Sequence, residues 1–533
     1  MPVVVDAKGL HDVEAGDLVD VVTGRGRAQV RARIGPANRI ENVLEALLVE
    51  TGARQEFEPH RPPAPSLEGR VDLRDLLTFT IDPETAKDFD DALSFRQETD
   101  GVRAWVHIAD VSYFVPAGSP LDHGAAGRAF STYVPGLVAP MLPHELADDL
   151  CSLRPHVDRL TVTVEFPPQG EPTMYRSVIR SDARLSYGQA QAREAQERVA
   201  EALELGWAYA GELRRARFGR GALRIETGEI RFEFDGDGGV ARAFRESEPE
   251  SHALVEELMI RANEAVAQLL SSRRREAIYR VHERPDPQAI GLLLAKLSDL
   301  QVPTPPAPAQ ESMSPAEAAR LAGAISDRVA AYVSQAGRGA EAFPALVLRS
   351  LKQARYDPAN LGHSGLASAA YCHFTSPIRR YPDLVVHRAL LAELGQGEDP
   401  APEDLGELAE HASQREREAA KVEYRADAIC LVWLLERVLY EQGWHEDFAG
   451  EVIGAIGSGI FVRFGEVFEG FLPARKLPGE YYELNALGTA MAGRRSGRTF
   501  RLGDPVEVRV ERIEHAEGKV ELALGSDAVR PSR

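Results

Sequence analysis

The chain has few cysteines and no long apolar stretch. Its three cysteines, Cys151, Cys372 and Cys430, lie far apart and form no CxxC pair. This spacing excludes a disulfide framework and is typical of a reducing cytoplasm. No apolar run approaches the roughly 18 residues that span a membrane, and residues 1–10 lack the basic and apolar segments of a secretory signal. We therefore expect a cytoplasmic protein without a membrane span.

The chain also lacks an excess of positive charge. It contains 62 Lys and Arg against 82 Asp and Glu, which gives a formal net charge of −20. This charge argues against a protein that coats duplex nucleic acid nonspecifically, because the phosphates would repel it. It does not exclude an enzyme that acts on nucleic acid, since arginines can line a channel while the outer surface stays acidic. Composition therefore leaves the substrate open.

The length of 533 residues predicts roughly three or four domains. Residues 1–75 are expected to form a small αβ unit, with strands over 17–22 and 27–34 and a helix over 41–51. Strand-like and helix-like patterns then alternate through residues 76–443, without an internal repeat. A long charged helix is expected at the end of this middle part.

Residues 444–533 change to short strands separated by glycine turns. The pattern predicts a five-stranded barrel, and the OB fold is such a barrel that binds oligonucleotides. Aromatic and basic residues in this part suit single-stranded nucleic acid, so we expect an independent single-strand binder. These residues are Phe461, Phe464, Phe468, Phe471, Arg494, Arg495, Arg498 and Arg501. A barrel core beside a solvated basic loop fits the same pattern equally well.

Acidic residues are concentrated between two strand-like runs. Asp88, Asp90 and Asp91 fall within four residues, and Asp82 lies six residues upstream. Close carboxylates cannot all stay ionised unaided, so a cation would stabilise them. Oxygen ligands suit Mg²⁺ or Mn²⁺ rather than zinc, and carboxylate metal sites commonly hydrolyse phosphodiesters. A solvated acidic loop is the alternative, whereas a calcium loop is excluded because its glycine and terminal glutamate are missing.

Two further segments carry residues suited to phosphate or base contacts. Thr375-Ser376-Pro377 is a helix-start signal, although Pro382 could instead set the start. Arg379 and Arg380 are adjacent and should point in different directions, so one of them could reach a phosphate at a carboxylate metal site. Tyr133 precedes a Pro-Gly turn and could present its ring to a base. A surface arginine pair and a packed tyrosine are the alternatives.

Taken together, these motifs closely resemble the RNB exoribonucleases of the ribonuclease II and ribonuclease R type. The resemblance is carried by residues 81–92, by the Pro-Gly and Met-Leu-Pro run of 135–153, and by the His-Phe-Thr-Ser-Pro-Ile-Arg-Arg-Tyr segment of 373–381. It extends over roughly residues 70–525, and the tail from Phe448 is similar to the RNA-binding OB domain that ends these enzymes.

The resemblance implies an α+β multidomain protein. A small N-terminal αβ domain (1–75) would precede a central mixed α/β RNB catalytic domain (76–443) and a C-terminal five-stranded OB-fold β-barrel (444–533). The implied activity is processive 3′→5′ hydrolysis of single-stranded RNA to nucleoside 5′-monophosphates. Mg²⁺ would be the cofactor, with Mn²⁺ as a substitute, and the family default is a monomer.

The resemblance also implies roles for the acidic cluster. Asp82, Asp88, Asp90 and Asp91 would be the catalytic carboxylates and metal ligands. Among them, Asp90 would orient or deprotonate the attacking water, with Asp88 beside it. Arg379 is similar to the arginine that steadies the scissile phosphate.

Four other residues match positions that hold the substrate in the family. Tyr133 is similar to the tyrosine that stacks on the 3′-terminal base, and Glu423 resembles a carboxylate that contacts the terminal nucleotide. Phe232 and Glu256 fall, by a looser alignment, where the family places an aromatic clamp and a nucleotide contact.

The N-terminus departs from the family pattern. Family members commonly carry two cold-shock barrels there, and about 75 residues cannot hold two such barrels. The expected helix points instead to a compact helix-containing unit, of which a winged-helix-like domain is one form. A catalytically silent RNA-binding relative and a DNA exonuclease are the alternative functions, because no residue by itself reveals 2′-hydroxyl recognition. The presence of all four aspartates and Arg379 favours the active enzyme.

Overall fold

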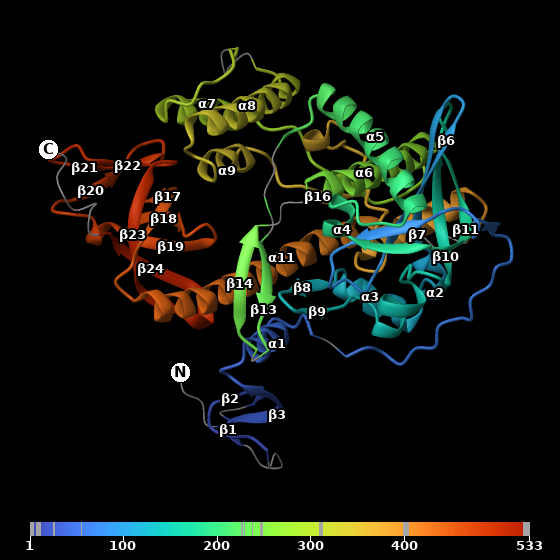
Figure 1. Ribbon diagram of the computed structural model, residues 1–533, viewed down its shortest axis with the longest axis horizontal. Coiled ribbons are helices and arrows are strands. Elements are labelled where there is room, and N and C mark those ends of the chain that lie inside the picture. The colour runs from blue at the N-terminus through green and yellow to red at the C-terminus, as the bar shows by residue number, and fades with distance from the viewer. Residues whose placement is uncertain are drawn as a thin grey trace.

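The structure is a computed structural model, and it shows several units arranged around one long helix (Figure 1). This helix, α11 (Leu405–Gln442), runs between a large α/β unit and a C-terminal barrel. The long charged helix expected at the end of the middle part is thereby confirmed. The residues that the structure describes are 5–6, 12–24, 27–54, 56–224, 228, 230–236, 238–245, 249–308, 313–397 and 404–525.

The N-terminal unit has a three-stranded sheet and one helix. Strand β3 (Arg27–Pro36) lies between β1 (Val5–Asp6) and β2 (Asp17–Gly24), and α1 (Ile40–Glu50) follows. Strands β2 and β3 and helix α1 lie where the alternating and helical patterns predict them, whereas β1 was not expected. The buried residues of α1 recur at helical spacing and form its apolar face: Ile40, Leu44, Leu47 and Leu48. This face joins a core that the N-terminal unit shares with the rest of the molecule.

The large unit is built on a seven-stranded sheet of order β12-β5-β6-β7-β10-β11-β4. Side chains of β6 alternate between the two faces, because Leu93 and Phe95 pack into one core and Ala92 packs into another. Helices α5 and α6 cover the first face. The bounds are β4 (Val71–Asp72), β5 (Phe79–Asp82), β6 (Asp91–Glu98), β7 (Gly101–Ala109), β10 (Asp158–Phe166), β11 (Thr173–Arg180), β12 (Ala183–Ser186), α5 (Glu197–Gly219) and α6 (Pro249–Ser272).

Shorter elements complete this unit and line the centre of the molecule. Two hairpins contact α11, one through β8 and the other through β14. They are β8–β9 (Thr132–Val134, Leu137–Ala139) and β13–β14 (Ile230–Phe234, Val240–Arg245). The remaining elements are α2 (Val111–Phe114), α3 (Pro120–Arg128), α4 (Tyr187–Gln191), β15 (Tyr279–Val281), α7 (Pro287–Asp299), α8 (Pro315–Ala336), α9 (Ala342–Arg349), β16 (Arg355–Asp357) and α10 (Tyr381–Glu393).

The C-terminal part is a closed five-stranded barrel, and its strands lie where the glycine-separated pattern predicts them. Their bounds are β17 (Asp447–Ile456), β18 (Gly459–Phe464), β19 (Phe468–Pro473), β23 (Pro505–Glu514) and β24 (Lys519–Leu524). A small sheet, which the sequence pattern missed, stands between β19 and β23 in the chain. It consists of β20 (Tyr482–Leu484), β21 (Ala490–Gly493) and β22 (Thr499–Arg501), which are too short to show alternation.

The barrel packs closely against neighbouring helices, while its role as an independent single-strand binder stays a prediction. Its core residues belong to one cluster with α1, α7, α8, α9 and α11. The Glu451 carboxylate of β17 accepts backbone N–H groups from Ala340 (3.1 Å), Glu341 (3.2 Å) and Ala342 (3.1 Å) at the start of α9. Phe343 of α9 is fully buried, and its ring lies where a side chain on Gly503 of the barrel would have to go. The barrel and the helical layer therefore stabilise each other.

We predict that Phe343→Ala lowers the free energy of unfolding by about 3–5 kcal/mol, because it leaves a cavity between α9 and the barrel. Urea unfolding followed by circular dichroism measures this change. Tyr440→Ala, at a side chain that is 77% exposed, is the control and should alter stability by less than about 0.5 kcal/mol. Equal stability of both variants would show that the barrel does not depend on this contact.

Candidate active site

Two neighbouring strands bring the acidic residues together. Asp82 ends β5 and Asp91 begins β6, and these strands pair antiparallel, so both carboxyl groups lie at one end of the pair. The connecting loop carries Asp88 and Asp90. Asp90 is 3% exposed and Asp82 is 9% exposed, so the cluster is set into the protein and is not a solvated loop.

Burial and mutual repulsion perturb these carboxyl groups. Burial, followed by the charge of Asp91, raises the pKa of Asp82 to about 8. Burial likewise raises the pKa of Asp91 to about 6, against the attraction of Arg379, and it raises the pKa of Asp90 well above the usual value. The positive charge near the cluster is therefore too small to keep all of its carboxyl groups ionised.

Asp90 is tied to the segment that carries the arginine pair. Its Oδ1 accepts the backbone N–H of Ile378 at 2.8 Å, and its Oδ2 lies 3.3 Å from Nε of Arg379. The Arg379 side chain is 47% exposed, so its remaining donors can reach a ligand. The sequence motifs at 82–91 and 373–381 thus meet in one place.

Arg380 points away from the cluster, as expected for adjacent arginines. It donates Nε (2.9 Å) and Nη2 (2.7 Å) to Asp383, whose Oδ1 also accepts the Ser376 N–H at 2.8 Å. Asp383 is completely buried at the first turn of α10. This helix begins at Tyr381, so Pro382 marks its start and Pro377 does not.

Two anchors of this segment were not found from sequence. Asp383 is one, and its position in a first helical turn was the available signal. The other is Asn263 of α6, whose Oδ1 accepts the Phe374 N–H at 2.8 Å and whose Nδ2 donates to the Tyr371 hydroxyl at 3.1 Å. Asn263 stands among apolar helix residues, and its pattern carries no local signal. Both anchors hold the backbone that presents Arg379.

Tyr133 joins the acidic cluster to α11. Its hydroxyl donates to Asp88 Oδ2 at 2.5 Å, and its backbone N–H donates to Glu423 Oε1 at 2.8 Å. Burial and the Asp88 charge raise the pKa of Tyr133, so the ring carries a neutral hydroxyl. Residues far apart in sequence, Asp88, Tyr133 and Glu423, therefore lie in one row.

Phe232 of β13 and Glu256 of α6, which the family resemblance implies as substrate contacts, contact residues outside the acidic cluster. Phe232 is partly buried and packs against the large core, whereas Phe234 on the same strand is 38% exposed. The Phe234 ring lies against Gly136, in the turn that follows Tyr133. Phe234 is thus a second aromatic ring near Tyr133, and strand alternation from Phe232 was the signal for it. Glu256 forms an ion pair with Arg217 of α5 at 3.4 Å.

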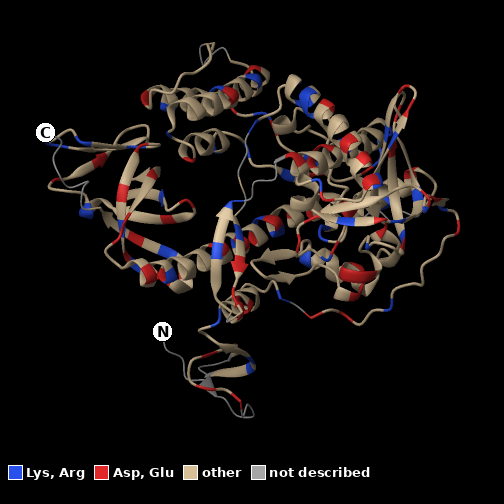
Figure 2. Cartoon of the chain, in the orientation of Figure 1, with Lys and Arg blue, Asp and Glu red and all other residues tan. Residues whose placement is uncertain are grey.

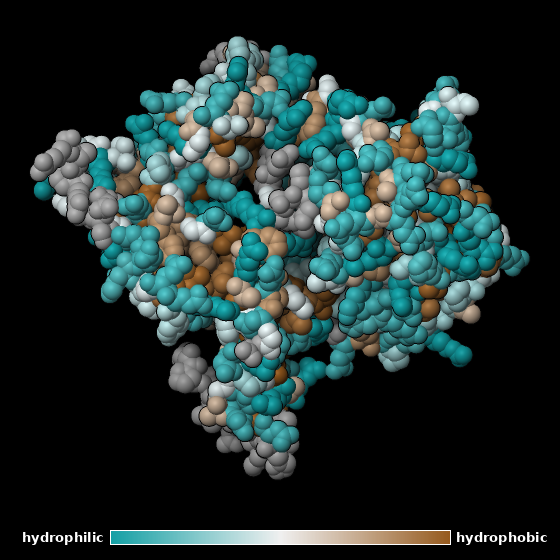
Figure 3. Space-filling model, viewed as in Figure 1, coloured by the Kyte–Doolittle hydropathy of each residue, from teal (hydrophilic) through white to brown (hydrophobic). Residues whose placement is uncertain are grey.

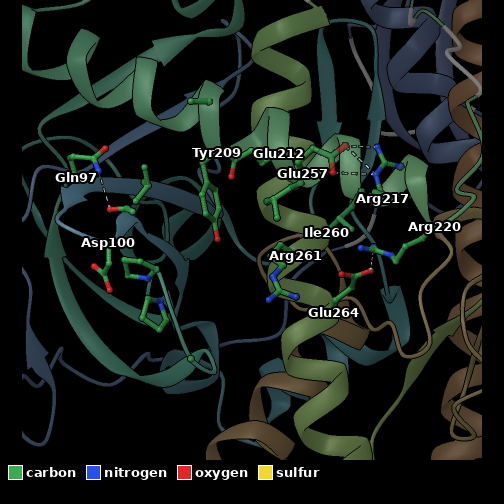
Figure 4. Close-up of a pocket in the computed structure, with 17 residues that line it drawn as sticks. Gln97, Asp100, Tyr209, Glu212, Arg217, Arg220, Glu257, Ile260, Arg261 and Glu264 are labelled. Carbon is green, nitrogen blue, oxygen red and sulfur yellow. Dashed lines mark hydrogen bonds and ion pairs between the residues drawn. The ribbon is translucent and has the colours of Figure 1, made fainter.

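A cavity of about 700 Å³ lies between α5, α6 and the nearby strand connections (Figure 4). Two of its three arginines pair with glutamates: Arg217 is 2.5 Å from Glu257, and Arg220 is 3.3 Å from Glu264. These pairs tie α5 to α6. None of the four aspartates lines this cavity.

The carboxylate cluster fits a divalent cation by its chemistry. Asp82 Oδ2 and Asp90 Oδ2 are buried without a hydrogen-bond partner, and the ligand set consists of oxygen atoms, which Mg²⁺ and Mn²⁺ prefer. Within the part of the chain that the structure describes, no three His, Cys, Asp or Glu side chains converge in a metal-binding arrangement. The carboxylates would have to turn toward a common ion, so ligation by Asp82, Asp88, Asp90 and Asp91 stays a prediction.

The four barrel phenylalanines considered for stacking divide into two groups. Phe464 and Phe468 are core residues, 1% and 6% exposed. Phe461 is 41% exposed, and its ring centroid lies 5.0 Å from that of the partly exposed Phe471. Only the second pair can offer a stacking surface. The arginines of the expected basic loop lie on or beside the small sheet, where Arg494 pairs with Glu483.

Charged residues and apolar residues are distributed differently over the molecule. Basic and acidic residues are interspersed along the described part of the chain (Figure 2). Apolar side chains gather in the hollowed middle of the face, between the barrel and β13–β14 (Figure 3). No described helix is long and apolar enough to cross a membrane.

Comparison with known families gives a direct match to this architecture. The RNB domain family matches residues 70–396, and the S1 RNA binding domain family matches residues 443–525. The chain belongs to the RNB family. The family resemblance seen in the sequence motifs is thereby confirmed, and the acidic cluster and Arg379 both lie within the matched RNB domain.

Relatives of this RNB protein include ribonucleases R. Ribonuclease R of Escherichia coli is 36% identical over 491 residues, which cover 87% of this chain and 58% of that protein. Ribonuclease R of Thermotoga maritima is 36% identical over 499 residues, covering 87% of this chain and 66% of that protein. The chain thus spans about three fifths of the length of these relatives.

Solved structures of the family share the fold. Mycoplasma genitalium RNase R in complex with ribose-methylated single-stranded RNA matches with a TM-score of 0.85 at 25% identity, over 98% of this chain and 85% of that one. Yeast Ssd1, described as a pseudonuclease, matches with a TM-score of 0.66 at 18% identity, over 89% of this chain and 61% of that one. The second likeness concerns the fold alone.

We predict that Asp383→Asn lowers the free energy of unfolding by about 3–5 kcal/mol, because it removes the buried charge that pairs with the partly buried Arg380. Glu418→Gln breaks the more exposed Arg415–Glu418 pair and serves as the control, with an expected change below about 1 kcal/mol. Chemical denaturation of both variants measures the difference. If Asp383→Asn matches the parent, the pair does not anchor the segment.

Proposed function

We propose that this protein is a processive 3′→5′ exoribonuclease that hydrolyses single-stranded RNA to nucleoside 5′-monophosphates with Mg²⁺. The observation that carries the proposal is the buried carboxylate cluster in contact with Arg379 and Tyr133, inside an RNB domain. The ribonuclease R relatives and the RNA-bound structure of Mycoplasma genitalium RNase R support RNA as the substrate. The S1 domain supports a second contact with RNA.

The reaction is attack of a water oxygen on the last phosphodiester. A new P–O bond forms, the bond from phosphorus to the 3′ oxygen breaks, and that oxygen takes a proton as the 3′-hydroxyl of the shortened chain. Asp90 would orient or deprotonate the water, with Asp88 beside it, and Arg379 would neutralise charge that develops on the phosphate. Asp82, Asp88, Asp90 and Asp91 would hold Mg²⁺, which supplies Lewis-acid stabilisation of the phosphate oxygens.

Substrate placement would depend on residues around Tyr133. Its ring would stack on the 3′-terminal base, which places the last phosphate beside Asp88. Glu423 would contact the terminal nucleotide, and its bond to the Tyr133 N–H supports this arrangement. Phe232 and Glu256 remain proposed as the aromatic clamp and a further nucleotide contact.

We propose a separate role for each part of the chain. Residues 1–75 would form the N-terminal domain, residues 76–443 would hydrolyse RNA, and residues 444–533 would bind it through Phe461 and the partly exposed Phe471. We further propose that the protein acts as a monomer in the cytoplasm. The three buried free cysteines are consistent with a reducing compartment.

A degradation assay tests the function. RNA and DNA oligomers of one sequence are incubated with and without Mg²⁺, and the products are separated by chromatography. We expect nucleoside 5′-monophosphates from RNA alone, and only with Mg²⁺. RNA that binds but stays intact would identify a silent relative, and equal loss of DNA would identify a DNA exonuclease.

Asp90→Asn should nearly abolish turnover and leave RNA affinity in place. The change keeps the side-chain volume but removes a charge that positions water or metal. Single-turnover cleavage and a binding assay with the same RNA measure the two effects. Cleavage at the parent rate would remove Asp90 from the catalytic assignment.

Arg379→Ala should lower the cleavage rate by about 10²–10³-fold, the usual effect of losing one preorganised donor to developing charge. Affinity should change little, since the interaction strengthens in the transition state. Arg379→Lys is the matched variant, which keeps the charge without the planar fork and should be intermediate. A loss of affinity with an unchanged single-turnover rate would make Arg379 an ordinary phosphate contact.

A further inference from the structure

The hairpin that carries Tyr133 is too small to hold its own shape. Its strands β8 and β9 pair through only three residues each, from Thr132 opposite Ala139 to Val134 opposite Leu137. An isolated two-stranded hairpin is marginally stable at best in water, and no other strand among the described residues pairs with this one. The position of Tyr133 must therefore depend on the elements that pack against the hairpin.

Helix α1 of the N-terminal unit supplies part of this packing, on the side of β9, whereas α11 packs against β8. The buried residues of α1 share one core with hairpin residues, and α1 packs against β9 and α11. The shared core contains Ile40, Leu44, Leu47 and Leu48 from α1, together with Val134 and Ala139 from the hairpin. The apolar face of α1 thus packs in the same core as the apolar residues of the hairpin.

Arg54 adds a polar link at the end of this helix. Its Nη1 donates to the Val138 carbonyl of β9 at 2.9 Å, while Nε and Nη2 donate to Glu45 of α1 at 3.0 and 2.8 Å. The helix end fixes the backbone there, because the Arg54 N–H donates to the Leu48 carbonyl at 3.0 Å after Gly52, whose φ is +71°. One guanidinium therefore joins α1 to β9.

A second arginine makes the reciprocal link. Arg128, at the end of α3, donates Nη1 to the Met141 carbonyl at 3.3 Å and Nη2 to the Glu56 carbonyl at 3.1 Å. Its guanidinium also lies 4.4 Å from the centre of the Phe57 ring. Arg54 thus ties the segment after α1 to β9, and Arg128 ties the same segment to Met141, which follows β9 in the chain.

We propose that the N-terminal unit is a buttress for the β8–β9 hairpin, and that Arg54 is a positioning residue that acts through Tyr133. Holding Val138 fixes the strand opposite Tyr133, and this fixes the ring relative to Asp88 and Glu423. The unit thereby affects how the last nucleotide is held for hydrolysis. The inference rests on the proposed function for its kinetic consequence, but its structural part can be measured without turnover.

Arg54→Met tests the link, because it keeps the length and apolar stem of the side chain and removes every donor. We expect a single-turnover rate that falls by between a few-fold and about 100-fold, as small misplacements of a substrate can cause. The end product should lengthen, and affinity for long RNA should stay at the parent value. Arg33→Met is the matched control, since Arg33 pairs with Asp17 inside the N-terminal sheet at 2.7 Å.

Amide hydrogen exchange provides the readout that needs no activity. Residues 132–139 should exchange faster in Arg54→Met than in the parent or in Arg33→Met. Glu45→Gln keeps the arginine and weakens its anchor, so it should give a smaller change in the same direction, and it decides the question if Arg54→Met does not fold. Arg54→Lys retains one donor group and should recover part of the protection.

The outcomes separate the two proposals. Unchanged exchange at 132–139 together with an unchanged rate and product length, in folded Arg54→Met or Glu45→Gln, would overturn the buttress. Faster exchange throughout the chain would also overturn it, since the effect would then be general destabilisation. If the parent releases no nucleotide from RNA, the proposed function fails, and the exchange comparison still decides the buttress.

Discussion

Carboxyl groups that are buried side by side repel one another when they ionise. The structure around Asp82, Asp88, Asp90 and Asp91 must hold these groups together against that repulsion. Burial disfavours the ionised carboxylates, and it raises the pKa of Asp82 to about 8 and the pKa of Asp91 to about 6. Asp90 finds one backbone N–H and the Arg379 guanidinium, while one of its oxygens stays without a hydrogen bond. A divalent cation would complete the balance.

The surrounding framework keeps this unfavourable arrangement in place. The pairing of β5 with β6 sets the positions of the outer aspartates, and the buried anchors Asp383 and Asn263 hold the segment that presents Arg379. Tyr133 connects the cluster to α11, and α11 in turn shares its core with the barrel and the N-terminal helix. The proposed substrate binding and hydrolysis would thus depend on one continuous packed structure.

Much of this site could be predicted from sequence because its acids are close together in the chain. The carboxylates occupy residues 82–91, and the paired arginines have opposite roles, as their adjacency indicates. The connection of Glu423 to Tyr133 joins residues 290 positions apart, so only family resemblance could suggest it. Phe234 was missed although strand alternation from Phe232 pointed to it, whereas Asn263 was missed because it owes its role to partners from a distant element.

The interfaces between units were the weakest part of the prediction. The apolar faces of α9 and α11 have ordinary helical spacing, which does not say what covers them, and they pack on the barrel. The short strands β20, β21 and β22 were likewise hidden by glycines and arginines. Residue patterns reveal which side is buried, whereas the partner depends on the tertiary structure.

Cation binding by the acidic cluster is tested most directly by calorimetric titration of the RNA-free protein with Mg²⁺ and, separately, with Mn²⁺. The comparison is between the parent and the double variant Asp88→Asn/Asp90→Asn, after circular dichroism has shown that both are folded. We predict saturable binding to the parent that is lost or strongly weakened in the variant, because the variant removes two carboxylate charges from the cluster. Equal binding by the two proteins, or none by the parent, would contradict the assignment of these aspartates as a metal site.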